Sequence, residues 1–235
     1  MKTPLNYAEE AVAFLRAADR TLAEIIAQVG PFQMMLRRGR FQVLVRAIIF
    51  QQLAGSAAQA IYDRFVGIFD SRAFPTPEQV ASAPDEKLRT VGLSRQKILY
   101  LKDLADRIAS GTLNLARFSV MEDEEIISEL TQVKGIGRWT AEMFLMFNLG
   151  RPDVLPVDDL GFRNAVAKAY GMERMPKTSE LRSLGEIWRP YRTVAVWYLW
   201  QSLKPRSPTP RVGGPAADGA SRGRSVVKKL RQPLD

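Results

Sequence analysis

The sequence predicts an all-α fold, and three observations lead to this prediction. Apolar residues recur at helical spacing in one segment after another, as in residues 20–30 and 41–53. Proline, capping residues and glycine occur where these segments begin and end. No sustained alternation of apolar and polar residues indicates a strand, and the extended stretch at residues 151–157 is interrupted by proline.

Each expected helix has a signal for its start or its end. Thr76 and Gln79 form a capping box with proline at the first helical position. Ser94 caps another helix, and acidic residues at 122–125 favour a helix start through the macrodipole. In chain order we expect helices over residues 20–30, 41–53, 56–69, 77 onward, 94–111, 121–133, 138–150, 158–171 and, as one or two helices, 179–203.

The composition limits the chemistry that this protein can perform. The chain has 235 residues and is 46% hydrophobic, which is enough for a sizeable core. It contains no Cys and no His, which excludes disulfides, thiolate nucleophiles, iron–sulfur clusters, the usual zinc sites and a Ser-His-Asp triad. An enzyme with this sequence must therefore use Asp, Glu, Lys, Tyr, Ser or Thr.

The charge suggests a polyanionic partner and is unevenly distributed. The net charge is +9, and the stretch from Lys204 to the end holds eight Lys and Arg against two Asp. Residues 205–235 are rich in Pro, Gly, Ser and Arg, so we expect a disordered basic tail. The tail either attracts nucleic-acid phosphates without sequence preference or contributes only solubility.

The sequence gives no sign of membrane insertion or export. No apolar run is long enough to span a bilayer. Glu9 and Glu10 interrupt the start of the chain, where a signal peptide needs an apolar core. We therefore expect a cytoplasmic protein, associated with the nucleoid in a bacterium or located in the nucleus of a eukaryote.

Two glycines precede an apolar helix in residues 130–147, LTQVKGIGRWTAEMFLMF. Gly135 and Gly137 predict a tight turn between two helices. One interpretation is an ordinary helical corner. In the other, free N–H groups at the start of the second helix bind a phosphate, and Lys134 and Arg138 add positive charge. The glycine pattern alone does not decide between them.

The longer segment, residues 130–163, resembles the hairpin and catalytic-aspartate region of the helix-hairpin-helix (HhH-GPD) DNA glycosylases. Within them it resembles most the alkylation-repair branch, 3-methyladenine DNA glycosylase II, in a short form without the N-terminal β-domain. The similarity covers residues 30–203. It implies a two-lobed helical domain over residues 1–204, with a hairpin lobe at about residues 75–165 and a second lobe built from residues 1–74 and 166–204.

The resemblance implies a monofunctional glycosylase of base excision repair. Such an enzyme flips out 3-methyladenine or 7-methylguanine and hydrolyses the N-glycosidic bond, leaving an abasic site. Its partner is double-stranded DNA with damaged bases, it requires no cofactor, and we expect a monomer. The resemblance also implies a structural monovalent cation, Na⁺ or K⁺, at the backbone carbonyls of Val133 and Gly135.

The family's catalytic aspartate corresponds to Asp159, twenty residues after Trp139. The sugar becomes positively charged as the base leaves, so an anion must stand close to it. Other branches of the superfamily align to Asp158 instead. A capping role before the next helix is the structural alternative, and both roles are met if Asp158 is the cap and Asp159 the catalytic group.

Trp139 and Trp200 match pocket tryptophans of the family, with core packing as the alternative. An alkylated purine already carries positive charge, so a single carboxylate suffices for its departure. Aromatic faces bind such a cationic ring. Relatives that also cut the strand have a lysine in the place of Trp139, and an indole cannot form their Schiff base. We therefore expect no lyase activity.

The same alignment assigns contacts with DNA. A loop that fills the space of the extruded base is expected at residues 51–53, and the sequence does not separate Gln52 from Leu53 as the wedge. A buried leucine near a helix end is the alternative. For Arg192 a structural salt bridge is favoured over a DNA contact. The expected DNA-binding residues are Lys134, Gly135, Gly137, Arg138, Thr140, Gln51, Gln52 and Leu53.

Two other functions fit parts of the sequence. One is a glycosylase for oxidised, deaminated or mismatched bases, although the absence of cysteine argues against its iron–sulfur branches. The other is a non-catalytic helix-hairpin-helix module that only binds DNA. Such a module needs only the hairpin, whereas this chain combines the hairpin with the spaced aspartate and both tryptophans.

Overall fold

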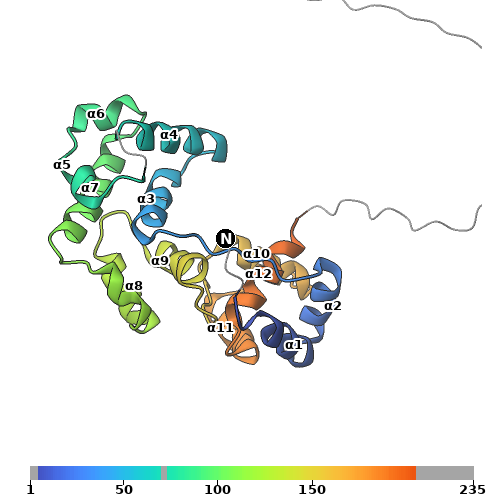
Figure 1. The fold of residues 1–235 in the computed structure, drawn as a ribbon. Coiled ribbons are helices and arrows are strands. Elements are labelled where there is room, and N and C mark those ends of the chain that lie inside the picture. The colour runs from blue at the N-terminus through green and yellow to red at the C-terminus, as the bar shows by residue number, and fades with distance from the viewer. Residues whose placement is uncertain (1–4, 70–72, 205–235) are drawn as a thin grey trace, which may run out of the picture. The chain divides into compact units, whose positions relative to one another are not determined.

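A computed structural model describes residues 5–69 and 73–204 of the chain. Twelve α-helices and three short 3₁₀ or π segments follow one another in these residues, which contain no strand (Figure 1). The predicted all-α fold is therefore confirmed. The chain divides into two units, residues 1–204 and 205–235, and the expected basic tail lies outside the described residues. None of the described helices is both long and apolar enough to cross a membrane.

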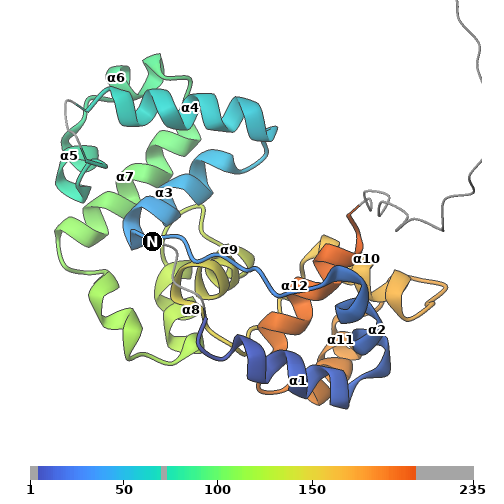
Figure 2. The same ribbon diagram turned by 45° about the vertical axis from the view of Figure 1, so that its right-hand side comes forward.

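The first group of helices combines both ends of the first unit. α12 contacts α1, α2 and α10, and α1 also contacts α2 (Figure 2). The side chains of α12 are buried without interruption from Thr193 to Leu199. This group comprises α1 (Ala8–Ala18), α2 (Arg20–Val29), α10 (Leu160–Ala169), α11 (Thr178–Gly185) and α12 (Arg192–Ser202).

The second group of helices contains the hairpin. α7 contacts α3, α5 and α6, and α3 also packs on α4. In both views α9 lies on the side of this group that is nearest to the first group, and it contacts α3 and α8 (Figures 1 and 2). This group comprises α3 (Arg40–Phe50), α4 (Gly55–Gly67), α5 (Pro77–Ser82), α6 (Asp85–Thr90), α7 (Arg95–Ala109), α8 (Asp123–Thr131) and α9 (Arg138–Phe144).

The grouping of α3 and α4 differs from the expected division of the domain near residue 74. That division placed residues 1–74 with the C-terminal helices. The buried side chains of α3, among them Leu44 and Ile48, instead accompany its contacts with α4 and α7. The apolar face of a helix determines its neighbours, and its position along the chain does not.

Local signals set several helix ends as expected. The Thr76 side chain accepts from the Gln79 N–H, and the Gln79 side chain accepts from the Thr76 N–H, so α5 begins with a complete capping box. Ser94 caps α7 by accepting from the Lys97 N–H. The predicted helix over residues 138–150 is less regular, because α9 continues into a π turn, Leu145–Leu149, that ends at Gly150.

The far end of α10 is anchored by Asp19, which is buried. The hydroxyl of Tyr170, the residue after α10, donates to Asp19 Oδ2 at 2.5 Å. The indole N–H of Trp188 donates to the same oxygen at 2.8 Å. Because Asp19 Oδ1 caps α2 through the Leu22 N–H, one carboxylate joins α2 to the end of α10.

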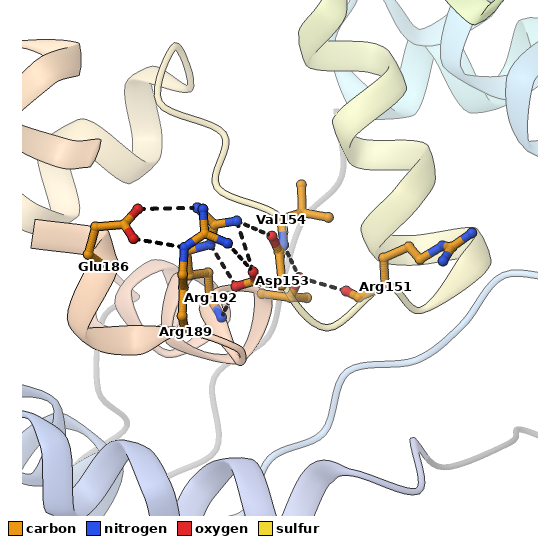
Figure 3. A network of polar contacts seen from close by, with 7 residues as sticks. Arg151, Asp153, Val154, Glu186, Arg189 and Arg192 are labelled. Carbon is orange, nitrogen blue, oxygen red and sulfur yellow. Dashed lines mark hydrogen bonds and ion pairs between the residues drawn. The ribbon is translucent and has the colours of Figure 1, made fainter. Parts of the chain in front are cut away.

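The connector between α9 and α10 is attached to α12 by a charged network (Figure 3). The Arg192 guanidinium donates to Asp153 Oδ1 at 2.6 Å and to the backbone carbonyl of Asp153 at 2.8 Å. Arg189 donates to Asp153 Oδ2 at 2.7 Å and to Glu186 at 2.9 Å. The Thr193 hydroxyl also accepts from the Val154 N–H. The expected structural role of Arg192 is confirmed, and the network fixes the segment that leads to Asp159.

Replacing Asp153 with Ala is expected to lower the free energy of unfolding by about 3 kcal/mol, because it leaves the largely buried Arg192 without its carboxylate. Chemical denaturation would measure this loss. Glu186→Ala is the matched control, since its contacts with Arg189 are solvent-exposed and contribute at most about 1 kcal/mol. Equal losses in the two variants would contradict the anchoring role of Asp153.

Candidate active site

The predicted hairpin is present, and its geometry explains Gly135. α8 ends at Thr131 and α9 begins at Arg138, with Gly137 in the N-cap position. Gly135 has φ of 81°, in the left-handed region that favours glycine. A Cβ atom there would lie 2.1 Å from Tyr100 Cδ2 of α7, so the turn packs directly against that ring. Only a residue without a side chain allows this approach.

Asp159 lies where three hydrogen-bond donors converge. The indole N–H of Trp139 donates to Oδ2 at 2.8 Å, and that of Trp200 donates to Oδ1 at 2.9 Å. The backbone N–H of Phe162 donates to Oδ1 at 2.5 Å. A carboxylate has acceptor sites for about four hydrogen bonds, so one site remains. The structure thus brings together the predicted aspartate, at the N-cap of α10, and both predicted tryptophans, which come from α9 and α12.

The helix cap corrects one expectation about the two aspartates. Asp159 itself caps α10 through the Phe162 N–H, whereas Asp158 is exposed. The expectation that Asp158 is the cap is therefore wrong. The reason is geometric, because the side chain immediately before the first helical residue reaches the free N–H groups of the first turn. Asp159 combines the capping position with the contacts to the indoles.

A pocket of about 610 Å³ lies between α3 and α9. Trp139, predicted for the base pocket, and Thr140, predicted to bind DNA, both belong to its lining. Trp200 does not line this pocket but stacks on Phe147, which does, with ring centroids 6.0 Å apart and an interplanar angle of 20°. Sequence reasoning missed the remaining apolar lining, because those side chains come from two helices that only the fold brings together. They include Val43, Ala47, Phe50, Met143 and Phe147.

Arg46 brings a positive charge to the α3 side of this pocket. Its guanidinium lies 3.7 Å from the centroid of the Phe50 ring and donates to Gln59 at 2.8 Å. Burial, and to a lesser degree the neighbouring Arg37, lowers the pKa of Arg46. A ring bound in the pocket would meet aromatic faces on α9 and this stacked cation on α3. The sequence contains no local pattern that predicts a cation there.

The predicted DNA-contacting side chains of the hairpin differ in accessibility. Lys134 is exposed, and its backbone N–H donates to Asp103 at 2.9 Å. The guanidinium of Arg138 is paired with Glu124 at 3.0 Å and with Glu142 at 3.1 Å. Thr140 is only 7% exposed. Of the predicted side chains, Lys134 is therefore the one presented to solvent without a carboxylate partner in the described contacts.

The structure separates the three residues of the predicted wedge loop. The Gln51 side chain is turned toward the hairpin, where its amide donates to the Gly135 carbonyl at 2.7 Å. Gln52 is exposed, lines the pocket and has φ of 56°, which is uncommon for a residue other than glycine. Leu53 is 39% exposed and is therefore not a buried core leucine. The loop presents Gln52 and Leu53 outward.

The carbonyls expected to bind a cation already accept hydrogen bonds. The Val133 carbonyl accepts from the Ile136 N–H at 3.0 Å, and the Gly135 carbonyl accepts from Gln51. No group of three or more acidic side chains in the described part of the chain is arranged to hold a metal. A monovalent ion at the hairpin would thus rely on backbone oxygens that also face N–H donors.

Glu142 is a buried acid on α9 that the sequence analysis did not identify. It is 4% exposed, and its carboxylate pairs with Arg138 one helical turn away. Burial raises the pKa of Glu142 to about 7, although the attraction of Arg138 acts in the opposite direction. The folded state therefore binds a proton on Glu142 more tightly than the unfolded state does.

The fold disfavours the ionised form of Glu142 and raises its pKa from the ordinary 4.5 to about 7. We therefore expect the free energy of unfolding to fall as the pH rises between these two values. Glu142→Gln should remove about 2 kcal/mol of this decline, measured by denaturation at pH 5 and pH 8. Glu124→Gln is the control. Arg138 lowers the pKa of Glu124, so ionisation of this acid raises the free energy of unfolding as the pH rises, opposite to the effect of Glu142. A decline that persists in Glu142→Gln would contradict this assignment.

Comparison with known proteins places the hairpin and Asp159 in a recognised family segment. Residues 45–190 match the HhH-GPD superfamily of base excision DNA repair proteins. The chain is 37% identical over 203 residues to DNA-3-methyladenine glycosylase 1 of Schizosaccharomyces pombe. The aligned region covers 86% of this chain and 89% of that protein.

Two solved structures resemble this fold. A 3-methyladenine DNA glycosylase of the same yeast in complex with abasic DNA has a TM-score of 0.73 and 38% identity, covering 82% of this chain and 96% of that one. A DNA-3-methyladenine glycosidase from Bacillus halodurans has a TM-score of 0.76 and 37% identity, covering 86% of this chain and 91% of that one.

Proposed function

Because the chain belongs to the HhH-GPD superfamily of base excision DNA repair proteins, we propose that it is a DNA-3-methyladenine glycosylase. It removes the alkylated purines 3-methyladenine and 7-methylguanine from double-stranded DNA and leaves an abasic site. The observation that carries the proposal is Asp159, held by two indole N–H groups at 2.8 and 2.9 Å beside an apolar pocket of about 610 Å³.

The proposed role of Asp159 is electrostatic. The damaged nucleotide leaves the base stack, because its glycosidic bond is inaccessible inside a duplex. As the bond to the base breaks, the sugar acquires positive charge, which the carboxylate of Asp159 stabilises. Its fourth acceptor site suits a hydrogen bond from the attacking water. The water oxygen bonds to the anomeric carbon, and the proton it loses passes to Asp159 and from there to solvent, which completes hydrolysis. The three donors from Trp139, Trp200 and Phe162 keep the carboxylate in place during this change.

On its α9 side, away from the Arg46 guanidinium on α3, the proposed pocket offers an aromatic face to a base that is already a cation. The aromatic face of Trp139, which is 47% exposed, offers a surface on which a methylated purine can stack. A cationic base departs as a neutral molecule, so no general acid is needed. The groups that contact Asp159 are indoles and a backbone amide, and an imine with the sugar would require an amine. We therefore propose hydrolysis without strand cleavage.

The proposed DNA interface combines the hairpin and the wedge loop. Backbone N–H groups near Gly135 and Gly137, together with Lys134, contact the phosphates of one strand. Gln52 and Leu53 enter the space left by the extruded base. A K⁺ or Na⁺ ion at the Val133 and Gly135 carbonyls would share oxygens with the donors of Ile136 and Gln51. Unchanged DNA affinity when tetramethylammonium replaces K⁺ at constant ionic strength would contradict this ion.

The test of the proposed function is release of free bases from methylated duplex DNA. Chromatography identifies the released bases, and alkali converts the abasic sites into strand breaks. We expect 3-methyladenine and 7-methylguanine, with breaks only after alkali. Release from DNA with oxidised or deaminated bases instead would assign another lesion class. Tight DNA binding without release of any base would indicate a non-catalytic module.

A further inference from the structure

A lysine of α7 holds the end of α3, directly before the wedge loop. Lys97 Nζ donates to the backbone carbonyls of Ile49 at 2.6 Å and of Gln51 at 2.9 Å. α3 ends at Phe50, so these carbonyls belong to the helix end, where oxygens lack partners within the helix and the macrodipole is negative. Lys97 is half-buried, and burial lowers its pKa.

A second contact connects the same loop to the hairpin. The Gln51 side-chain amide donates to the Gly135 carbonyl at 2.7 Å. Gly135 in turn packs against the ring of Tyr100, which lies one helical turn after Lys97 on α7. α7 therefore contacts both elements: Lys97 holds the wedge loop and Tyr100 supports the hairpin. Gln51 joins the loop and the hairpin directly.

The wedge loop requires such support. Gln52 has φ of 56°. This backbone conformation is unfavourable for any residue with a side chain, and it persists only when the surrounding structure enforces it. Gln52 and Leu53 are exposed and contribute little packing of their own. A loop that separates stacked bases works against a resistance of a few kcal/mol for each base step. Without support, the wedge loop would change its conformation before the stacked bases separate.

We infer that Lys97 is a positioning residue for base extrusion: it keeps Gln52 and Leu53 at a fixed distance from the hairpin. Phosphate binding at Gly135 and insertion of the loop then act on DNA at a constant separation. The inference rests on the proposed function, because it assigns this loop the extrusion step. Lys97 does not contact Asp159 and takes no part in breaking the glycosidic bond.

Extrusion can be measured without the chemical step. The probe is a duplex with a tetrahydrofuran abasic analogue opposite 2-aminopurine, whose fluorescence rises when its stacking is disturbed. Lys97→Met removes the ammonium and retains the apolar stem, while Lys97→Arg retains the donors. Lys102→Met is the matched control, because Lys102 lies on the same helix and pairs with Asp85 at 2.5 Å, away from the loop. If Lys97→Met does not fold, Lys97→Gln replaces it.

Lys97→Met should bind the probe with an affinity within about 3-fold of the native value. Its fluorescence rise on binding should be about 5-fold or more smaller than that of the native protein. Lys97→Arg and Lys102→Met should retain both. An undiminished rise in Lys97→Met, or a rise reduced only in proportion to bound DNA, would overturn the inference and leave Lys97 a structural residue. Absence of the rise in the native protein would overturn insertion by the loop, whereas release of methylpurines would still uphold the proposed function.

Discussion

Replacing Asp159 with Asn is expected to slow base release by about 10²–10³-fold while DNA affinity stays within a few-fold of the native value. The amide has the same shape and still caps α10, since Asn is as good an N-cap as Asp. It lacks the negative charge that stabilises the sugar cation. Its NH₂ group would also face an indole N–H in place of an acceptor, because Trp139 and Trp200 donate to different oxygens.

Single-turnover release from methylated DNA, with enzyme in excess, would measure this effect separately from product dissociation. Asp158→Asn is the control, because it also removes one negative charge, but from the exposed side chain of the preceding residue. We expect it to release bases at nearly the native rate. Loss of activity in Asp158→Asn alone would transfer the catalytic role to Asp158. Equal, small losses in both variants would show that neither carboxylate stabilises the sugar.

Replacing Gly135 with Ala is expected to lower the free energy of unfolding by about 4 kcal/mol and to weaken DNA binding with it. Two costs combine at this position. A side chain at φ of 81° is strained, at about 1 kcal/mol or more. In addition, its Cβ would lie 2.1 Å from the Tyr100 ring, so the turn or the ring must move. Either movement shifts the carbonyl that Gln51 binds.

Gly111→Ala separates these two costs, because Gly111 has φ of 78° and open space where a Cβ would be. We expect it to lose about 1 kcal/mol, the strain alone. Combining Gly135→Ala with Tyr100→Ala should restore part of the stability, since the second change removes the clash. Denaturation curves for Gly135→Ala, Gly111→Ala, Tyr100→Ala and the double variant decide the matter. A loss in Gly135→Ala no larger than that in Gly111→Ala would show that contact with Tyr100 does not matter.

Local signals in the sequence predicted local structure well. The capping box at Thr76, the Ser94 cap and the turn at Gly135 all form as expected, because each depends on residues within one helical turn. The first helix, Ala8–Ala18, was not identified among the expected helices, and its N-cap side chain makes no capping hydrogen bond. The break between α9 and its π turn has no marker residue in the apolar run that forms it.

Contacts between distant segments explain what the sequence did not predict. The motif identified Asp159 and the two tryptophans, but their hydrogen bonds join residues 20 and 41 positions apart. The bond between Gln51 and Gly135 spans 84 positions. Such pairs depend on which helix faces meet, and that is decided by packing over the whole domain. For the same reason, the pairing of Arg138 with Glu124, 14 positions earlier, could not be predicted. The pairing of Arg138 with Glu142 is a local contact one helical turn along α9.

Asp159 is both the N-cap of α10 and the acceptor of the two indole hydrogen bonds, and this combination restricts which amino acids the site tolerates. Serine or threonine would start α10 equally well but could not supply a charge. Glutamate would supply the charge, yet its longer side chain is a poor N-cap and would move the carboxylate away from the indoles. Asparagine would cap the helix, but it would supply no charge and could accept a hydrogen bond from only one of the two indoles. A library of all substitutions at residue 159 should therefore show many stable proteins and a single active one, so that screening for folding alone would miss the loss of function.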